Sequence, residues 1–135
     1  MLWAKLPLLL HTIIETAAAL SFICKPEAQL PAASDDARLI LQSYGGLLLS
    51  SNILCVLFLA RPGLDSATGL VALGVASYHL WPARRAFVRI HRGIGIGAEQ
   101  RRQTRVLGGP SFHFVVHVVC FVALMGTGLV GLRSA

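Results

Sequence analysis

Two ionisable side chains lie within the first apolar stretch of the chain, and their spacing brings them together. His11 and Glu15 are four residues apart and therefore share one face of a helix, together with Ala19 and Phe22. A carboxyl group at membrane depth is costly and usually serves a function. Beside an imidazole it can act as a general acid or base. The alternative is a structural hydrogen bond to a neighbouring helix.

The second apolar stretch carries two amides on one helical face. Four residues recur there at helical spacing, namely Gln42, Gly45, Leu49 and Asn52. We expect Asn52 at a depth similar to that of Glu15, where its amide can bond that carboxyl group or a ligand. The other interpretation is helix packing, in which the amides are polar contacts between neighbouring helices.

The last apolar stretch contains a second pair at this spacing, His113 and His117. Two imidazoles four residues apart on a helix can meet one metal ion or face a porphyrin. Zinc, however, takes three or four ligands, and His79 is the only other imidazole expected at the same level. We therefore expect no metal and no other cofactor, and interpret these histidines as lining a polar pocket in the cytosolic third of a helix bundle or as capping the end of the bundle.

Together these residues define a candidate acid–base site in a lipophilic cavity. Glu15 would transfer the proton, assisted by His11, Asn52 or His117. The surrounding Leu, Val, Phe and Ala side chains suit a lipophilic ligand. The set holds a single carboxylate at membrane depth, which is not a complete catalytic constellation, so the sequence leaves open whether the protein is an enzyme.

The composition shows which elements must position these side chains. Hydrophobic residues make up 55% of the 135 positions and charged residues only 13%, with a mean hydropathy of +0.67. Soluble domains contain about 25% charged residues, so this chain is expected to be an integral membrane protein. Its net charge of +6 does not indicate nucleic-acid binding, because most of the basic residues lie in one stretch between apolar segments.

Four segments are candidates for membrane-spanning helices. A bilayer core about 30 Å thick needs about 20 apolar residues in a helix, and the candidates are 6–24, 39–60, 66–81 and 112–132. The third is short and is followed by Pro82, so it must thin the bilayer or continue past a proline kink. Ser34 and Ser111 are expected N-caps of the second and fourth helices. We predict an all-α protein whose residues 1–135 form a single membrane domain, an antiparallel four-helix transmembrane bundle.

The distribution of basic residues predicts the orientation of this bundle. Nine of the twelve Lys and Arg residues fall in the first loop and in the segment 82–111, which we therefore predict to be a basic cytosolic loop. Both termini are then non-cytosolic. Within this loop Arg85, Arg89 and Arg92 share a helical face beside Trp81 and Phe87, an arrangement that suits anionic lipid headgroups. The simpler interpretation is that the arginines only determine topology.

Several strings resemble a group of small uncharacterised four-helix membrane proteins of filamentous fungi. They are LLLHTIIE at 8–15, ARLILQSYGG at 37–46, YHLWPARRA at 78–86 and GGP at 108–110. Such proteins are similar in size and arrangement to the DoxX-like class, which includes redox-associated subunits and assembly factors. The resemblance implies a fungal setting in the endoplasmic reticulum or another endomembrane, and it transfers no catalytic residue.

Two functions remain from the sequence. The first is a noncatalytic accessory or assembly partner in the membrane, with the polar residues serving packing and partner contact. The second is a membrane-embedded acid/base enzyme, such as an isomerase or cyclase, acting on a terpenoid, sterol or polyketide in fungal secondary metabolism. The expected partners are the lipid bilayer, anionic headgroups, a lipophilic small molecule and further subunits in a homo- or hetero-oligomer, but not nucleic acid.

Overall fold

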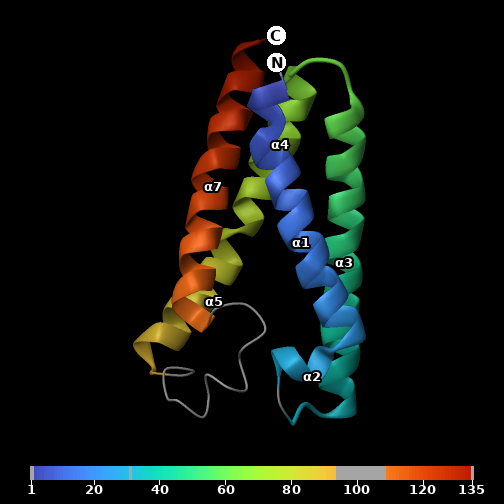
Figure 1. Cartoon of the computed structure of the whole chain (residues 1–135), viewed down its shortest axis with the longest axis vertical. Helices are drawn as coiled ribbons and strands as arrows, with labels where there is room; N and C mark the ends of the chain where they lie inside the picture. Colours follow the sequence, from blue (N-terminus) through green and yellow to red (C-terminus); the bar gives the residue numbers. More distant parts are fainter. Residues whose placement is uncertain (1, 31, 94–108, 135) are drawn as a thin grey trace. The chain divides into compact units, whose positions relative to one another are not determined.

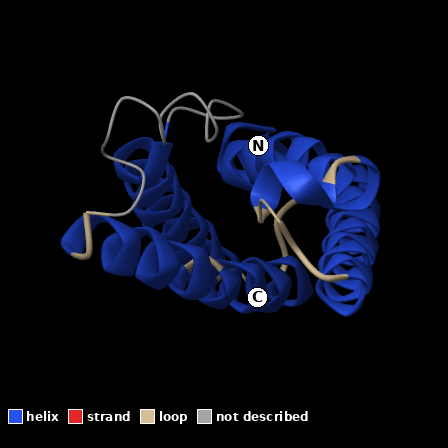
Figure 2. Ribbon diagram, turned by 90° about the horizontal axis from the view of Figure 1, so that it is seen from below, coloured by secondary structure: helices blue, strands red, loops and turns tan. Residues whose placement is uncertain are grey.

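The computed structural model describes residues 2–30, 32–93 and 109–134, and the regular structure of these residues is helical, with no strand among them (Figures 1 and 2). The all-α prediction is thus confirmed. The elements are η1 (Leu2–Lys5), α1 (Leu6–Cys24), α2 (Pro26–Gln29), α3 (Asp35–Ala60), α4 (Ser66–Tyr78), α5 (Leu80–His91) and α7 (Gly109–Arg133). Three helical stretches of the described chain are long and apolar enough to cross a membrane, namely Trp3–Cys24, Asp35–Ala60 and Gly109–Arg133.

The chain divides into two compact units. Residues 8–61 form the α1–α3 unit, and residues 1–7 together with 62–135 form the α4–α7 unit. The second unit therefore includes η1 at the start of the chain and α7 at its end. Each unit has its own helix contacts.

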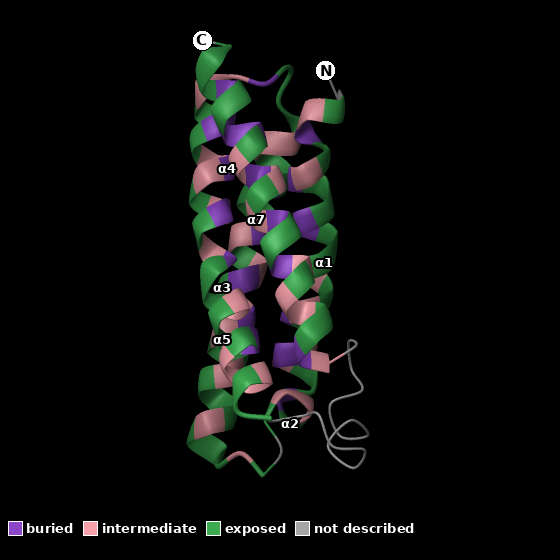
Figure 3. Ribbon diagram, turned by 90° about the vertical axis from the view of Figure 1, so that its left-hand side faces the viewer, coloured by how far each residue is buried: buried purple, intermediate pink, exposed green. Residues whose placement is uncertain are grey.

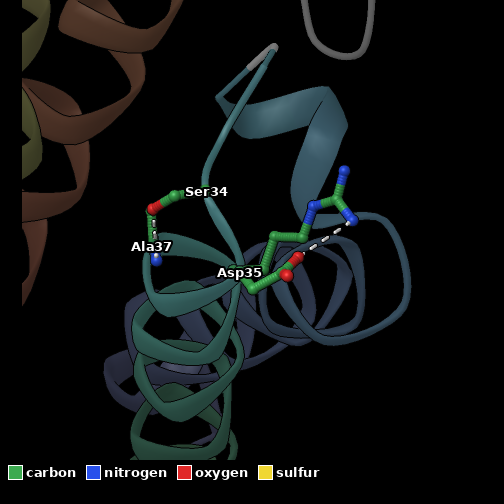
Figure 4. Close-up of polar contacts among 4 residues, drawn as sticks. Ser34, Asp35 and Ala37 are labelled. Atoms are coloured by element: carbon green, nitrogen blue, oxygen red, sulfur yellow. Dashed lines mark hydrogen bonds and ion pairs between the residues drawn. The ribbon is translucent and has the colours of Figure 1, made fainter.

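The starts of two helices test the predicted caps. α3 begins at Asp35, where Ser34 Oγ accepts a hydrogen bond of 3.2 Å from the Ala37 N–H (Figure 4). The Ser34 cap is thus confirmed. The Ser111 cap is wrong, because α7 begins at Gly109 and places Pro110 in its first turn. A proline is well suited to that position, since an N–H group there has no partner within the helix.

The third predicted helix, 66–81, is interrupted at His79. α4 ends at Tyr78 and α5 starts at Leu80, with His79 between them. Pro82 explains the break, because it has no N–H to donate and its ring crowds the carbonyl group four residues earlier, that of Tyr78. The helical backbone hydrogen bonds resume directly after Pro82, since the Ala83 N–H donates to the His79 carbonyl at 3.1 Å. The chain therefore continues past the proline to His91.

This continuation changes the predicted basic loop. Its first part, residues 82–91, is helical and belongs to α5. Residues 94–108, with three of its arginines, lie outside the described residues. The described basic residues of this segment therefore stand on a helix that is joined directly to α4.

Each long helix buries a narrow stripe of residues, which we call its seam, and leaves most of its surface exposed (Figure 3). Buried positions recur at alternating spacings of three and four residues, which is the pattern of helices packed side by side at a shallow angle. In α1 they include Leu8, Thr12, Glu15, Ala19 and Phe22, in α3 Gly45, Leu48, Asn52 and Cys55, and in α7 His117, Cys120, Leu124, Thr127 and Gly131. Small and polar residues in the seam with large apolar residues outside are typical of helices surrounded by lipid.

Glycines hold α4 against α7 in the α4–α7 unit. A Cβ atom added to Gly69 would lie 2.8 Å from the Gly128 carbonyl oxygen, and one added to Gly131 would lie 2.7 Å from the Gly69 Cα atom. The two backbones are therefore in direct contact at this end of the unit. Beside this contact, Thr127 Oγ1 donates a 3.0 Å hydrogen bond to the Ala4 carbonyl and ties η1 to α7.

A similar close approach joins α1 to α3. A Cβ atom added to Gly45 would lie 2.9 Å from the Ala19 carbonyl oxygen. Nearby, the Phe22 and Tyr44 rings meet edge to face at 4.9 Å. Gln42 Nε2 donates at 3.2 Å to the Ile23 carbonyl, one of the last carbonyl groups of α1, which have no partner within their own helix.

Candidate functional site

The first part of the candidate site lies on the buried seam of α1. His11 and Glu15 are each 1% exposed, and they share the seam with Ala19 and Phe22. The helical face predicted from their spacing is thus confirmed. Thr12 lies on the same seam, and its hydroxyl donates at 2.8 Å to the Leu8 carbonyl of its own helix.

Asn52 contributes from the facing seam of α3 and is 2% exposed. Its Nδ2 donates a 3.0 Å hydrogen bond to Thr16 Oγ1, on the residue next to Glu15. Sequence reasoning missed Thr16, although a hydroxyl group beside Glu15 in an apolar stretch was the available signal. The Asn52 Oδ1 atom is buried and accepts no hydrogen bond from any described residue.

The α1–α3 unit therefore contains a polar layer inside two apolar helices. Its members are His11, Thr12, Glu15 and Thr16 from α1 and Asn52 from α3. The layer offers one carboxyl group for proton transfer and one buried amide oxygen that can accept a hydrogen bond. It also links α1 to α3 through the bond between Asn52 and Thr16.

The α4–α7 unit contains a second polar contact, between His79 and His117. Their Nδ1 atoms are 2.8 Å apart, and both side chains are buried. In a hydrogen bond between two imidazole nitrogens, one Nδ1 carries the hydrogen and the other accepts it. The two Nδ1 atoms therefore differ in whether they carry a hydrogen. The break at Pro82 places His79 at the junction of α4 and α5, opposite α7.

Aromatic rings surround this histidine pair. The Tyr78 ring meets the His79 ring at 5.2 Å and the His117 ring at 6.5 Å, edge to face in both cases. The His113 ring is nearly parallel to that of His117, at 6.4 Å. His113 Nδ1 lies 2.9 Å from the Gly109 carbonyl oxygen, which can only accept, so this nitrogen carries the hydrogen. His113 and His117 therefore bond different partners, despite the spacing that suits a shared metal ion.

The four predicted site residues are distributed over both units. Glu15, His11 and Asn52 belong to the α1–α3 unit, where the hydrogen bond of Asn52 goes to Thr16. His117 belongs to the α4–α7 unit, where it bonds His79. The His79–His117 bond could not be predicted from spacing, which indicated only a similar depth for the two rings.

Comparison with known proteins gives no relative for this chain. No protein-family profile matches it, and neither does any curated protein or solved structure. Functional inference therefore rests on the residues themselves.

Proposed function

We propose that this chain is a multi-pass integral membrane protein with a noncatalytic role, an accessory or assembly partner. The observation that carries the proposal is that polar side chains inside the apolar helices bond neighbouring helices. Asn52 bonds Thr16, and His79 bonds His117. Hydrogen bonds of this kind contribute to helix association in membranes, so these polar groups have a structural use without any catalysis.

The lengths of the helices support a four-helix antiparallel transmembrane bundle. Three stretches are long and apolar enough to cross by themselves. α4 has 13 residues and spans about 20 Å at about 1.5 Å per residue, which is short of a 30 Å core. The stretch from Ser66 to Ala83, past the break, reaches about 27 Å. We propose α4 with the first turn of α5 as the fourth crossing.

The charge distribution supports cytosolic loops and non-cytosolic termini. The resemblance to small fungal membrane proteins implies the endoplasmic reticulum or another endomembrane. Single cysteines at Arg92→Cys and Ser134→Cys, in a background without native cysteines, test this orientation. An impermeant maleimide added to sealed microsomes should label Arg92→Cys, whereas Ser134→Cys should need detergent. Labelling of Ser134→Cys in intact microsomes would reverse the orientation.

The outer faces of the helices support an accessory role. α3 exposes large apolar side chains along its length, among them Leu39, Ile40, Leu47 and Leu57, each more than half exposed. In a bilayer such a face contacts lipid or another membrane subunit, in a homo- or hetero-oligomer. The resemblance to small fungal membrane proteins and to the DoxX-like class, with its assembly factors, fits this role.

One observation favours a second candidate, a membrane-embedded acid/base enzyme acting on a lipophilic substrate. Asn52 Oδ1 is a buried acceptor with no hydrogen-bond partner among the described residues, and Asn52 bonds the residue next to Glu15. A substrate hydroxyl group could donate to this oxygen while Glu15 moves a proton. Terpenoids, sterols and polyketides of fungal secondary metabolism have the required apolar body and few polar groups.

Two substitutions at Glu15 separate the candidates. Glu15→Gln keeps the shape and hydrogen bonding of the side chain but cannot exchange a proton, whereas Glu15→Leu removes the polar group. For the noncatalytic protein, Glu15→Gln should leave the metabolites of the host unchanged. Glu15→Leu should lower the stability in detergent by about 0.5 to 2 kcal/mol. Loss of a product in Glu15→Gln, with the fold intact, would establish the enzyme instead.

A further inference from the structure

The second half of the described α4–α5 segment carries a concentration of positive charge. α5 contains Arg84, Arg85 and Arg89, and Arg92 is its C-cap residue. No Asp or Glu occurs anywhere between Ser66 and Gly93. The segment therefore provides no acidic partner for its own arginines.

Three of these basic residues have no acidic partner elsewhere in the described part of the chain. Arg38 and Asp35, for comparison, form an ion pair at 3.7 Å. Arg84, Arg89 and Arg92 form no ion pair with a described residue. No described acidic residue therefore neutralises these three guanidinium groups, two on α5 and one at its C-cap, and each can bind an anion.

α5 is held firmly on α7 and turns its other sides outward. Ala86 is buried, and the Phe87 ring lies 6.2 Å from that of Phe114 on α7. Trp81 is 71% exposed and Phe87 is 56% exposed. On a helix, Arg89 and Arg92 are three residues apart and lie on the side that carries Trp81, whereas Arg84 is three residues from both Trp81 and Phe87 and lies between them.

The length of the helix places this surface at the edge of the bilayer. If α4 enters the hydrocarbon core near Ser66, the chain reaches the opposite boundary about 27 Å later, at Ala83. Arg84 is the next residue. Trp81 then lies in the boundary region, where tryptophan is enriched, and the arginines lie at the level of the headgroups.

We propose that α5 is a docking surface for anionic phospholipids. The guanidinium groups of Arg84, Arg89 and Arg92 bind the phosphate groups of the lipid headgroups, and Trp81 and Phe87 pack against the adjoining glycerol and acyl region. The exposed rings beside the arginines favour a lipid over a free phosphate ion, which would gain nothing from apolar contact. This proposal rests on the membrane placement given under the proposed function.

The two tryptophans of the chain provide a test with an internal control. Trp81 lies on α5, whereas Trp3 lies in η1, which packs at the opposite, glycine-containing end of the α4–α7 unit. Trp3→Phe leaves Trp81 as the only reporter, and Trp81→Phe leaves Trp3. The full chain is reconstituted in phosphatidylcholine vesicles with a minor fraction of phosphatidylglycerol, and either lipid carries bromine as a quencher.

We expect the fraction of brominated phosphatidylglycerol next to Trp81 to exceed its bulk fraction by about fivefold or more. One basic residue at an anionic surface strengthens binding by about that factor. Trp3 should show no enrichment. The variant R84Q/R89Q/R92Q should remove the preference at Trp81, and the matched variant R61Q/R133Q should preserve it. High salt should weaken the preference.

Three results would overturn the proposal. They are quenching of Trp81 by the two lipids in proportion to their bulk fractions, an enrichment that survives R84Q/R89Q/R92Q, and an enrichment that inorganic phosphate abolishes at constant ionic strength. The last result would indicate a site for the free ion. Quenching of Trp81 by brominated phosphatidylcholine alone would still show contact with the bilayer. A failure of the lipid preference can therefore be distinguished from a failure of the membrane placement.

Discussion

Replacing Gly69 with alanine should separate α4 from α7. The new Cβ atom would lie 2.8 Å from the Gly128 carbonyl oxygen and 3.0 Å from the Leu132 nitrogen, whereas ordinary contacts lie at 3.4–4 Å. Both neighbours are backbone atoms and cannot rotate away, so the helices must move apart locally by about 0.5 to 1 Å. When two contacting atoms separate by that distance, they lose about a quarter to a half of their attractive dispersion energy.

The expected change in the free energy of unfolding combines the loss from overpacking with a gain in helix propensity. Overpacking of this kind costs about 1 to 3 kcal/mol. Alanine recovers up to about 1 kcal/mol through its higher helix propensity. With the full recovery, we therefore expect Gly69→Ala to lower the free energy of unfolding by up to about 2 kcal/mol, and to be about 1 to 3 kcal/mol less stable than an alanine at a glycine with open space beside it.

Two other glycines on the same helices are matched controls. A Cβ atom added to Gly74 on α4 or to Gly126 on α7 meets no atom within 4 Å. Gly74→Ala and Gly126→Ala should therefore be neutral or slightly stabilising. The free energies are measured by reversible unfolding in mixed micelles, followed by circular dichroism. Equal stability of Gly69→Ala and Gly74→Ala would refute the backbone contact between α4 and α7.

Further outcomes follow from the polar contacts. Asn52→Leu should destabilise the α1–α3 unit by about 0.5 to 2 kcal/mol in thermal unfolding. Ser50→Ala, at an exposed position of the same helix, should have little effect. Equal effects of the two substitutions would contradict a stabilising role for the Asn52 hydrogen bond. His117→Phe removes the partner of His79 Nδ1 and should cost about 1 to 3 kcal/mol. The ¹⁵N resonances of His79 should change in His117→Phe, and unchanged resonances would show that the two rings do not share a hydrogen.

The helical stretches could be located from the sequence, because each is a long apolar run ended by charged residues or proline. The predicted bounds of α1 agree with the structure, since Lys25 and Pro26 end the run abruptly. The apolar span was predicted to begin at Leu39, whereas α3 begins at Asp35, directly after the predicted Ser34 cap, because hydropathy alone does not register a polar first turn. Hydropathy also does not register the break at His79, which depends on the backbone of Pro82.

The faces of the helices were also predictable, but the partners across them were not. The spacing of His11 and Glu15 placed both on one seam correctly. The partner of Asn52 is Thr16 rather than Glu15, and a change of one residue along α1 turns the side chain by about 100°. Periodicity identifies the buried side of each helix, whereas the relative shift of two helices depends on close contacts such as that at Gly45.

The bond between Thr127 and Ala4 has a consequence for the synthesis of the chain. It joins residues 123 positions apart, so it cannot form until residue 127 has been translated. The α1–α3 unit comes from the continuous stretch 8–61 and can assemble early, while the ribosome is still producing the later helices. The α4–α7 unit combines residues 1–7 with residues from 62 onward and is therefore completed after the α1–α3 unit. A nascent chain that stops before residue 127 leaves η1 without this anchor.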